Sequence, residues 1–394
     1  MGKRQLGIGR NLRKRQKTEV ASKAEKKQAN GLKESAEKDT EEYITVPLDE
    51  EADAEDPTSQ LRALWKTWLD SDRESELLLN GIVNECDRLV RLADKVSKTR
   101  KDQTIELESD VYAIFGMALA ELAKFHTEDT TAGSTVKDYF DNAVERIELG
   151  EARKPENGII RLAHASVDLS RIPLEYISKM DLDSKAKAFP NIEKLLDKAL
   201  EEYSSGYRQK WVLEIFDSLD DLIDIVKSFG EDHNEQIDSD DEESLEKAEA
   251  GANGKTIVKK EHPLYQLIEQ VEEDGNKYSS FFEKQLLNFL KEVSVAKKAT
   301  AGGEELKQGA ESKLGLWLLA KAAELQFEGE DKAHDEGIKI LRKAIEHLEK
   351  SWNEEIPSTW VDLAEAKNQL GKANNATHGK YQEILDSLVD GKSD

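Results

Sequence analysis

The sequence predicts an all-α fold of helical hairpins that stack into a tetratricopeptide-like superhelix, with a disordered N-terminal tail and an acidic internal linker. Three observations lead to this prediction. Apolar residues recur every three or four positions along most of the chain, and no stretch alternates apolar and polar residues over the length of a strand. Small residues also stand at spacings that let paired helices approach closely. Because 394 residues exceed what one hydrophobic core usually organises, we expect two helical blocks.

The N-terminal tail, residues 1–58, lacks hydrophobic periodicity and is basic at first and acidic later, which predicts disorder. Its first 38 residues contain twelve Lys and Arg against four Glu. An extended cationic peptide fits the acidic groove of an import receptor, so the tail predicts a nuclear import signal and such a receptor as a partner. The candidate residues for the signal are Lys3, Arg4, Arg13, Lys14, Arg15 and Lys17. The alternative is a basic arm that touches RNA or ribosomes.

The first helical block is expected at residues 59–230. Its apolar residues advance by three and four positions, as they do from Leu79 to Leu89, so each helix would bury one face against a neighbour. A second such series begins at Trp211, and Gly230 follows it as a helix-ending residue.

Two segments of this block match the tetratricopeptide pattern. In that pattern a small residue on each helix lets the pair approach, and a proline ends the second helix. The matching residues are Tyr112, Phe115, Gly116, Leu119, Ala143, Ile147, Gly150 and Pro155. A looser second match surrounds Ala344, Leu348 and Ser351. The alternative is a generic helical bundle in which the spacing is coincidental.

An acidic, flexible linker is expected at residues 231–261, because like charges repel and glycines loosen the chain. Within it, Ser239 precedes three acidic residues and is a candidate phosphosite for an acidophilic kinase. The second helical block is expected at residues 262–394, where an apolar series runs from Ile338 to Trp352.

Composition narrows the function classes. The longest apolar run, from Val111 to Ala120, is too short for the ~20 residues of a membrane-spanning helix, so we expect no membrane segment. Seven scattered histidines and one cysteine, Cys86, suggest no metal site, and no nucleophile–base arrangement stands out. We therefore expect a non-enzymatic protein without a cofactor. The net charge of −25 favours basic proteins as partners and leaves RNA to the tail.

Four tryptophans are candidate anchors for a partner protein, because tryptophan is enriched at the energetic centres of interfaces. They are Trp65, Trp68, Trp317 and Trp360. For each of them the alternative is core packing.

Several short stretches carry a resemblance to a known family. They are Leu6–Gly9, Leu79–Val83, Glu85–Leu89, Asp141–Gly150, Arg171–Ser178, Ile237–Asp240, Glu261–Pro263, Lys372–Asn374 and His378–Lys380. In this order they resemble the enhancer of translation termination 1 family of fungal nuclear proteins. The resemblance implies a nuclear protein needed for efficient stop-codon recognition. It also implies a link to hypoxic gene expression, alongside a prolyl hydroxylase partner that acts on a ribosomal protein. It implies no catalytic or ligand-binding residues.

The expected function is therefore that of a nuclear adaptor, with shuttling to the cytoplasm left open. It would hold basic proteins of the translation termination or ribosomal machinery through aromatic anchors and charge. Two alternatives remain: a helical scaffold whose basic arm binds RNA or ribosomes, and an enzyme whose site is hidden among the helices.

Overall fold

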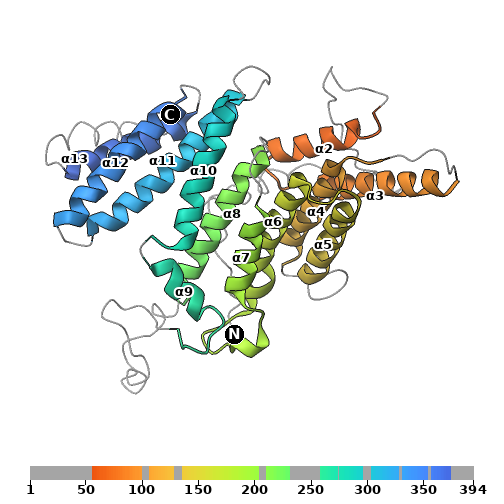
Figure 1. Cartoon of the computed structure of the whole chain (residues 1–394), viewed down its shortest axis with the longest axis horizontal. Helices are drawn as coiled ribbons and strands as arrows, with labels where there is room; N and C mark the ends of the chain where they lie inside the picture. Colours follow the sequence, from red (N-terminus) through yellow and green to blue (C-terminus); the bar gives the residue numbers. More distant parts are fainter. Residues whose placement is uncertain are drawn as a thin grey trace, which may run out of the picture. The chain divides into compact units, whose positions relative to one another are not determined.

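The computed structural model describes residues 56–99, 106–127, 135–203, 210–230, 258–273, 275–295, 303–327, 331–353 and 356–373. Within these ranges the regular structure is helical and no strand occurs, which confirms the all-α prediction (Figure 1). The α-helices are α2 (Ser59–Asp70), α3 (Glu76–Thr99), α4 (Ser109–Ala123), α5 (Val136–Arg153), α6 (Gly158–Arg171), α7 (Ile192–Glu202), α8 (Lys210–Lys227), α9 (Tyr265–Glu272), α10 (Lys277–Val295), α11 (Gly303–Phe327), α12 (Asp331–Ser351) and α13 (Pro357–Ala373). None of the described helices is both long enough and apolar enough to cross a bilayer.

The chain divides into two compact units. The first comprises Met1–Ser204 and Asp217–Glu272, and the second comprises Ser205–Phe216 and Glu273–Asp394. Helix α8 therefore contributes its first part to the second unit and its remainder to the first. This division differs from the expected bounds at 230 and 262, which came from the position of the acidic stretch. Packing sets the division instead, because Phe216 contacts the Phe282 ring edge-on at 5.3 Å within the second unit.

Helix α4 forms the centre of the first unit and is buried along nearly its whole length. It packs against α3, α5 and α6, and α6 in turn packs against α7. Polar side chains fix the helix starts. Asn157 accepts from the N–H groups of Ile159 and Ile160 at the start of α6, and Asn191 accepts from the Lys194 N–H at the start of α7.

The α4–α5 pair interlocks through glycine. A Cβ atom on Gly116 would lie 2.5 Å from Ile147 Cγ1, and one on Gly150 would lie 2.6 Å from Tyr112 Cβ. Ala143 between them is fully buried. The glycines thus let the two helices approach closely, as the tetratricopeptide spacing predicts. Seven of the eight repeat residues are buried. The eighth, Pro155, is exposed and follows the end of α5 at Arg153.

The second unit repeats this arrangement in α11 and α12. A Cβ atom on Gly315 would lie 2.7 Å from Leu348 Cγ, and Ala344 and Ser351 on the same helix are buried. Helical hairpins of one kind therefore occur in both units. The looser tetratricopeptide match around Leu348 corresponds to α12, the second helix of this pair. The sequence pattern does not predict the first helix, α11, which carries Gly315.

His262 fastens the chain where it re-enters the described structure after residue 257. Its Nε2 lies 2.9 Å from the Asp181 carbonyl oxygen, and its Nδ1 accepts from the Leu264 N–H at 3.1 Å. The ring is therefore the neutral tautomer that donates from Nε2. The Ala186 N–H also donates to the Glu261 carbonyl oxygen at 3.0 Å. These bonds give the Glu261–Pro263 stretch a structural role.

We expect His262 to make stability depend on pH. Burial lowers the pKa of His262, so the folded state binds fewer protons than the unfolded state. Its contribution is complete above the unfolded pKa near 6.5 and is lost as pH falls through that value toward the folded pKa. Urea midpoints at pH 7.5 and 5.5 should differ less for His262→Gln than for the unchanged chain. The effect is at most about 1.4 kcal/mol per pH unit, and equal differences would contradict it.

Candidate functional site

Two of the stretches that carry the family resemblance, Asp141–Gly150 and Arg171–Ser178, meet on one face of the first unit. Arg171 is the last residue of α6, and a π-helical turn, Ile172–Tyr176, follows it directly. Pro173 lies within this turn and has no N–H to give to the carbonyl four residues earlier. At the end of the turn the Ile177 N–H bonds to the carbonyls of Ile172 and Pro173. Single π-helical turns inside helices are frequent at functional sites.

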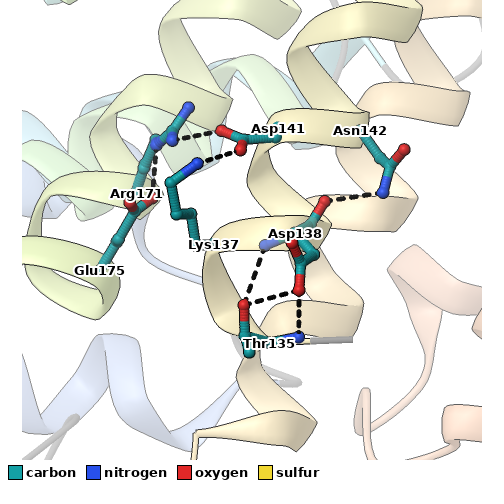
Figure 2. Close-up of polar contacts among 7 residues, drawn as sticks. All are labelled: Thr135, Lys137, Asp138, Asp141, Asn142, Arg171 and Glu175. Atoms are coloured by element: carbon teal, nitrogen blue, oxygen red, sulfur yellow. Dashed lines mark hydrogen bonds and ion pairs between the residues drawn. The ribbon is translucent and has the colours of Figure 1, made fainter. Parts of the chain in front are cut away.

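Arg171 joins the π turn to α5 through two ion pairs (Figure 2). Its Nη2 donates to Asp141 Oδ1 at 2.6 Å, and its Nε donates to Glu175 Oε2 at 2.6 Å. The guanidinium also lies over the Tyr176 ring, 5.8 Å from its centroid. Lys137, one turn before Asp141 on α5, bonds to the other carboxylate oxygen of Asp141. We call these five residues the Arg171 network.

The Arg171 network is partly buried and therefore strongly coupled. Glu175 is only 4% exposed, so its charge depends on Arg171 for compensation. Hydrogen bonds from Lys137, and then from Arg171, outweigh burial and hold the pKa of Asp141 below its usual value. Burial alone would lower the pKa of Arg171, but its bonds to Glu175 and Asp141 raise it overall. Lys137, Asp141 and Arg171 are thus charged at neutral pH.

The start of α5 positions the exposed half of the network. Thr135 and Asp138 form a capping box: Thr135 Oγ1 accepts from the Asp138 N–H at 3.3 Å, and Asp138 Oδ2 accepts from the Thr135 N–H at 2.8 Å. Asn142 donates to the Asp138 carbonyl at 2.8 Å (Figure 2). The first turn is therefore fixed, which places Lys137 and Asp141 on one helix face.

A second arginine joins three helices of the same unit. Arg153 on α5 donates to Tyr112 Oη on α4 at 2.5 Å and to Asp94 Oδ1 on α3 at 2.9 Å. Sequence patterns revealed neither arginine, because helical periodicity reports apolar faces and not polar bonds between helices. The combination of Arg171 with a following proline was the available signal.

The chemistry of these groups suits recognition. The charged groups of the network are paired with one another, and no general base adjoins a nucleophile there. Burial raises the pKa of the Cys86 thiol, which keeps it in the unreactive protonated form. In the described ranges, no group of three or more His, Cys, Asp and Glu is placed to hold a metal ion.

Each of the four candidate tryptophan anchors is buried or partly buried within its own unit. Trp68 is completely buried and Trp65 is nearly so. Trp317 stacks on Phe282 with ring centroids 5.5 Å apart, and Trp360 Nε1 donates to the Asn353 carbonyl at 2.8 Å. These contacts favour core packing. The candidate import residues, Lys3, Arg4, Arg13, Lys14, Arg15 and Lys17, and the candidate phosphosite Ser239 lie outside the described residues.

Fold and site together define a helical-hairpin protein in which arginine-centred ion pairs tie neighbouring helices and no catalytic arrangement appears among the described residues. The chain belongs to the family described as nuclear pore complex subunit Nro1, whose family model matches residues 1–372. Neither that description nor the names of the relatives indicates an enzyme.

The relatives cover the whole chain. An enhancer of translation termination 1 from Scheffersomyces stipitis is 34% identical over 99% of this chain and 100% of its own length. Those of Saccharomyces cerevisiae strain S288c and Clavispora lusitaniae are 34% and 31% identical, again over 99% of this chain, and are covered over 100% and 99% of their own lengths. The resemblance seen in the sequence is confirmed. The family description agrees with the predicted nuclear location.

Two solved structures also align with the chain. One is described as the hypoxic regulator of sterol synthesis Nro1, a nuclear import adaptor; it is 17% identical, covers 85% of this chain and 88% of its own, and has a TM-score of 0.47. The other is the S. pombe nuclear import adaptor Nro1, which is 15% identical, covers 89% and 93% of the two chains, and has a TM-score of 0.44.

Proposed function

We propose that this protein is a non-enzymatic nuclear adaptor required for correct translation termination. The observation that carries the proposal is the match, over 99% of the chain at up to 34% identity, to proteins named enhancer of translation termination 1. The Arg171 network supports an adaptor role, because its paired charges fix a helical surface and do not form a nucleophile–base pair.

The distribution of charge supports basic partners from the ribosomal or termination machinery. Residues 39–55 contain eight Asp and Glu and no Lys or Arg, and residues 231–257 contain ten Asp and Glu against two Lys. Each of these two segments, which lie outside the described helices, carries a net charge of −8 within the chain's total of −25. They would attract cationic segments over the screened range of about 8–10 Å at physiological salt.

We further propose a link to the regulation of hypoxic gene expression through a prolyl hydroxylase partner. The support is the sequence resemblance described above. Co-purification of this chain with a prolyl hydroxylase under low oxygen would support the link. A purification that retains ribosomal proteins but contains no prolyl hydroxylase would contradict it.

Stop-codon readthrough tests the main proposal. In a Saccharomyces cerevisiae strain that lacks its own enhancer of translation termination 1, this chain should restore low readthrough of a dual reporter. A chain without residues 1–38 should accumulate to the same level in the cell but stay outside the nucleus, because it lacks the import signal. High readthrough despite nuclear accumulation of the full chain would refute the proposal.

The alternative is a helical scaffold whose basic N-terminal arm binds RNA or ribosomes. Twelve basic residues in the first 38 favour it, since Lys and Arg neutralise phosphates. Crosslinking of RNA to the full chain and to a chain without residues 1–38 separates the two. If removal of residues 1–38 abolishes RNA crosslinking while the protein partners stay bound, the tail is an RNA-binding arm and the helical units are the adaptor.

A further inference from the structure

Helix α10 of the second unit presents one stripe of exposed residues to solvent. Its apolar residues at helical spacing, among them Phe282 and Leu286, are buried. The six exposed positions follow one another at spacings of three and four residues, so they share the opposite face of the helix. They are Lys277, Ser280, Lys284, Leu287, Lys291 and Val295. We call these six residues the α10 stripe.

Aromatic contacts within the second unit fix the orientation of α10. The Phe282 ring meets the Phe216 ring edge-on at 5.3 Å and stacks on the Trp317 ring of α11 at 5.5 Å. Tyr278, on the same face as Phe282, is completely buried. The helix therefore cannot turn the α10 stripe inward. A surface that is fixed before binding loses less conformational entropy when a ligand arrives.

The charge of the α10 stripe is opposite to that of the chain. Three of its six residues are lysines spaced seven positions apart and none is acidic, whereas the chain has a net charge of −25. Among the described residues, Lys284 and Lys291 form no ion pair. The two acidic residues of α10, Glu283 and Glu292, are partly buried beside the stripe, and Glu283 lies 3.6 Å from Lys321 of α11. The lysines of the stripe are thus available to carboxylates of another molecule.

Two large apolar side chains accompany these lysines. Leu287 is 44% exposed, and Val295 is 78% exposed, the largest fraction for any large apolar side chain in the described ranges. Large apolar side chains that share an exposed surface mark interaction sites. Positions that alternate by three and four residues are also those through which one helix contacts a second helix along its length. The α10 stripe therefore has the spacing and the chemistry of a helix-docking surface.

Charge and spacing together define the ligand. Seven residues of α-helix rise about 10.5 Å, so carboxylates seven residues apart on a second helix would meet the lysines in register. A second copy of α10 does not fit, because it would place lysines against lysines. Nucleic acids and anionic membranes carry negative charge over areas much wider than the stripe, and the acidic remainder of the chain would repel them.

We propose that the α10 stripe docks an acidic amphipathic helix of a partner protein. Asp or Glu side chains of that helix pair with Lys277, Lys284 and Lys291, and its apolar side chains cover Leu287 and Val295. This partner is of opposite charge to the basic partners proposed above. The inference does not rest on a role in termination, since docking is measured on the purified chain and not through readthrough.

Binding of a designed peptide to the full chain tests this proposal. The probe is a fluorescent helical peptide of 19 residues, the length of α10, with glutamates seven residues apart and leucines between them on one face. Fluorescence anisotropy should show saturable binding of one peptide per chain. A peptide of the same composition in scrambled order keeps the attraction to basic segments but lacks the face, so we expect it to bind about tenfold more weakly or less.

Charge reversal in the α10 stripe supplies the first comparison. Lys284→Glu with Lys291→Glu should weaken binding of the probe by about tenfold or more, because two attractive pairs become repulsive. The matched control is Lys339→Glu with Lys343→Glu, which changes the net charge by the same amount on the exposed face of α12, where acidic side chains are exposed as well. The control should change the affinity by less than about twofold. Circular dichroism should show the same helical content in both variants.

Removal of the apolar side chains supplies the second comparison. Leu287→Ser with Val295→Ser keeps the charge and should also weaken binding by about tenfold. Undetectable binding of the probe, equal binding of the scrambled peptide, or unchanged affinity in either stripe variant overturns the proposal. Preferential binding of single-stranded RNA or of phosphatidylserine vesicles that is lost in the charge-reversed chain also overturns it, because the stripe then recognises another class of ligand.

Discussion

Replacing Gly116 with alanine should lower the free energy of unfolding of the first unit by about 2 kcal/mol, although alanine is the better helix former. The new Cβ would lie 2.5 Å from Ile147 Cγ1 and 3.1 Å from the Ala143 carbonyl oxygen. The isoleucine branches close to the backbone and the carbonyl belongs to α5, so relief requires the two helices to move apart. Urea unfolding followed by far-ultraviolet circular dichroism measures the loss.

Gly81 in α3 is the matched control. Nothing lies within 4 Å of a Cβ atom built there, so Gly81→Ala should be neutral or stabilise by up to about 1 kcal/mol. Ile147→Ala should cost less in the Gly116→Ala background than in the unchanged chain, because it vacates the space that the new methyl group needs. Equal effects of alanine at positions 116 and 81 would show that the helices do not interlock there.

Replacing Arg171 with methionine should cost the largest amount, about 3–5 kcal/mol, because it leaves the charge of Glu175 buried without a partner. It also removes the bond to Asp141 that ties the π turn to α5. We expect a lower urea midpoint, and faster amide hydrogen exchange in residues 172–180 than in α2.

Two further variants isolate the buried charge. Lys137→Met breaks an exposed pair on the same carboxylate, so it should lower the urea midpoint far less than Arg171→Met does. Arg171→Met combined with Glu175→Met removes both charges and should recover most of the loss. If the double variant is no more stable than Arg171→Met, the cost comes from lost packing and not from the unpaired carboxylate.

Sequence patterns predicted the fold where apolar or small residues recur at helical spacing. The spacing of Gly116, Ala143 and Gly150 located the α4–α5 pair, because small residues allow two helices to approach closely. The division of the chain could not be read in this way. Both parts of α8 follow one apolar series, and tertiary contacts such as that of Phe216 with Phe282 assign its first part to the second unit.

The candidate site was less accessible to sequence reasoning. Burial of a tryptophan depends on how its helix meets the rest of its unit, and periodicity treats Trp352 and Leu348 as equivalent members of one series. Trp352 follows the last residue of α12, Ser351, and is exposed, whereas Leu348 within the helix is completely buried. The Arg171 network similarly depends on a π turn, which local propensities do not specify.

The π turn at residues 172–176 holds one residue more than an α-helical turn would. Removing that residue would rotate everything beyond it by about 100° around the helix axis. Glu175 would then leave Arg171, and Met180, now buried, would turn toward solvent. The length of this segment therefore determines which side chains of its continuation are buried. Relatives should tolerate exchanges of side chains here far more readily than a change in length by a single codon.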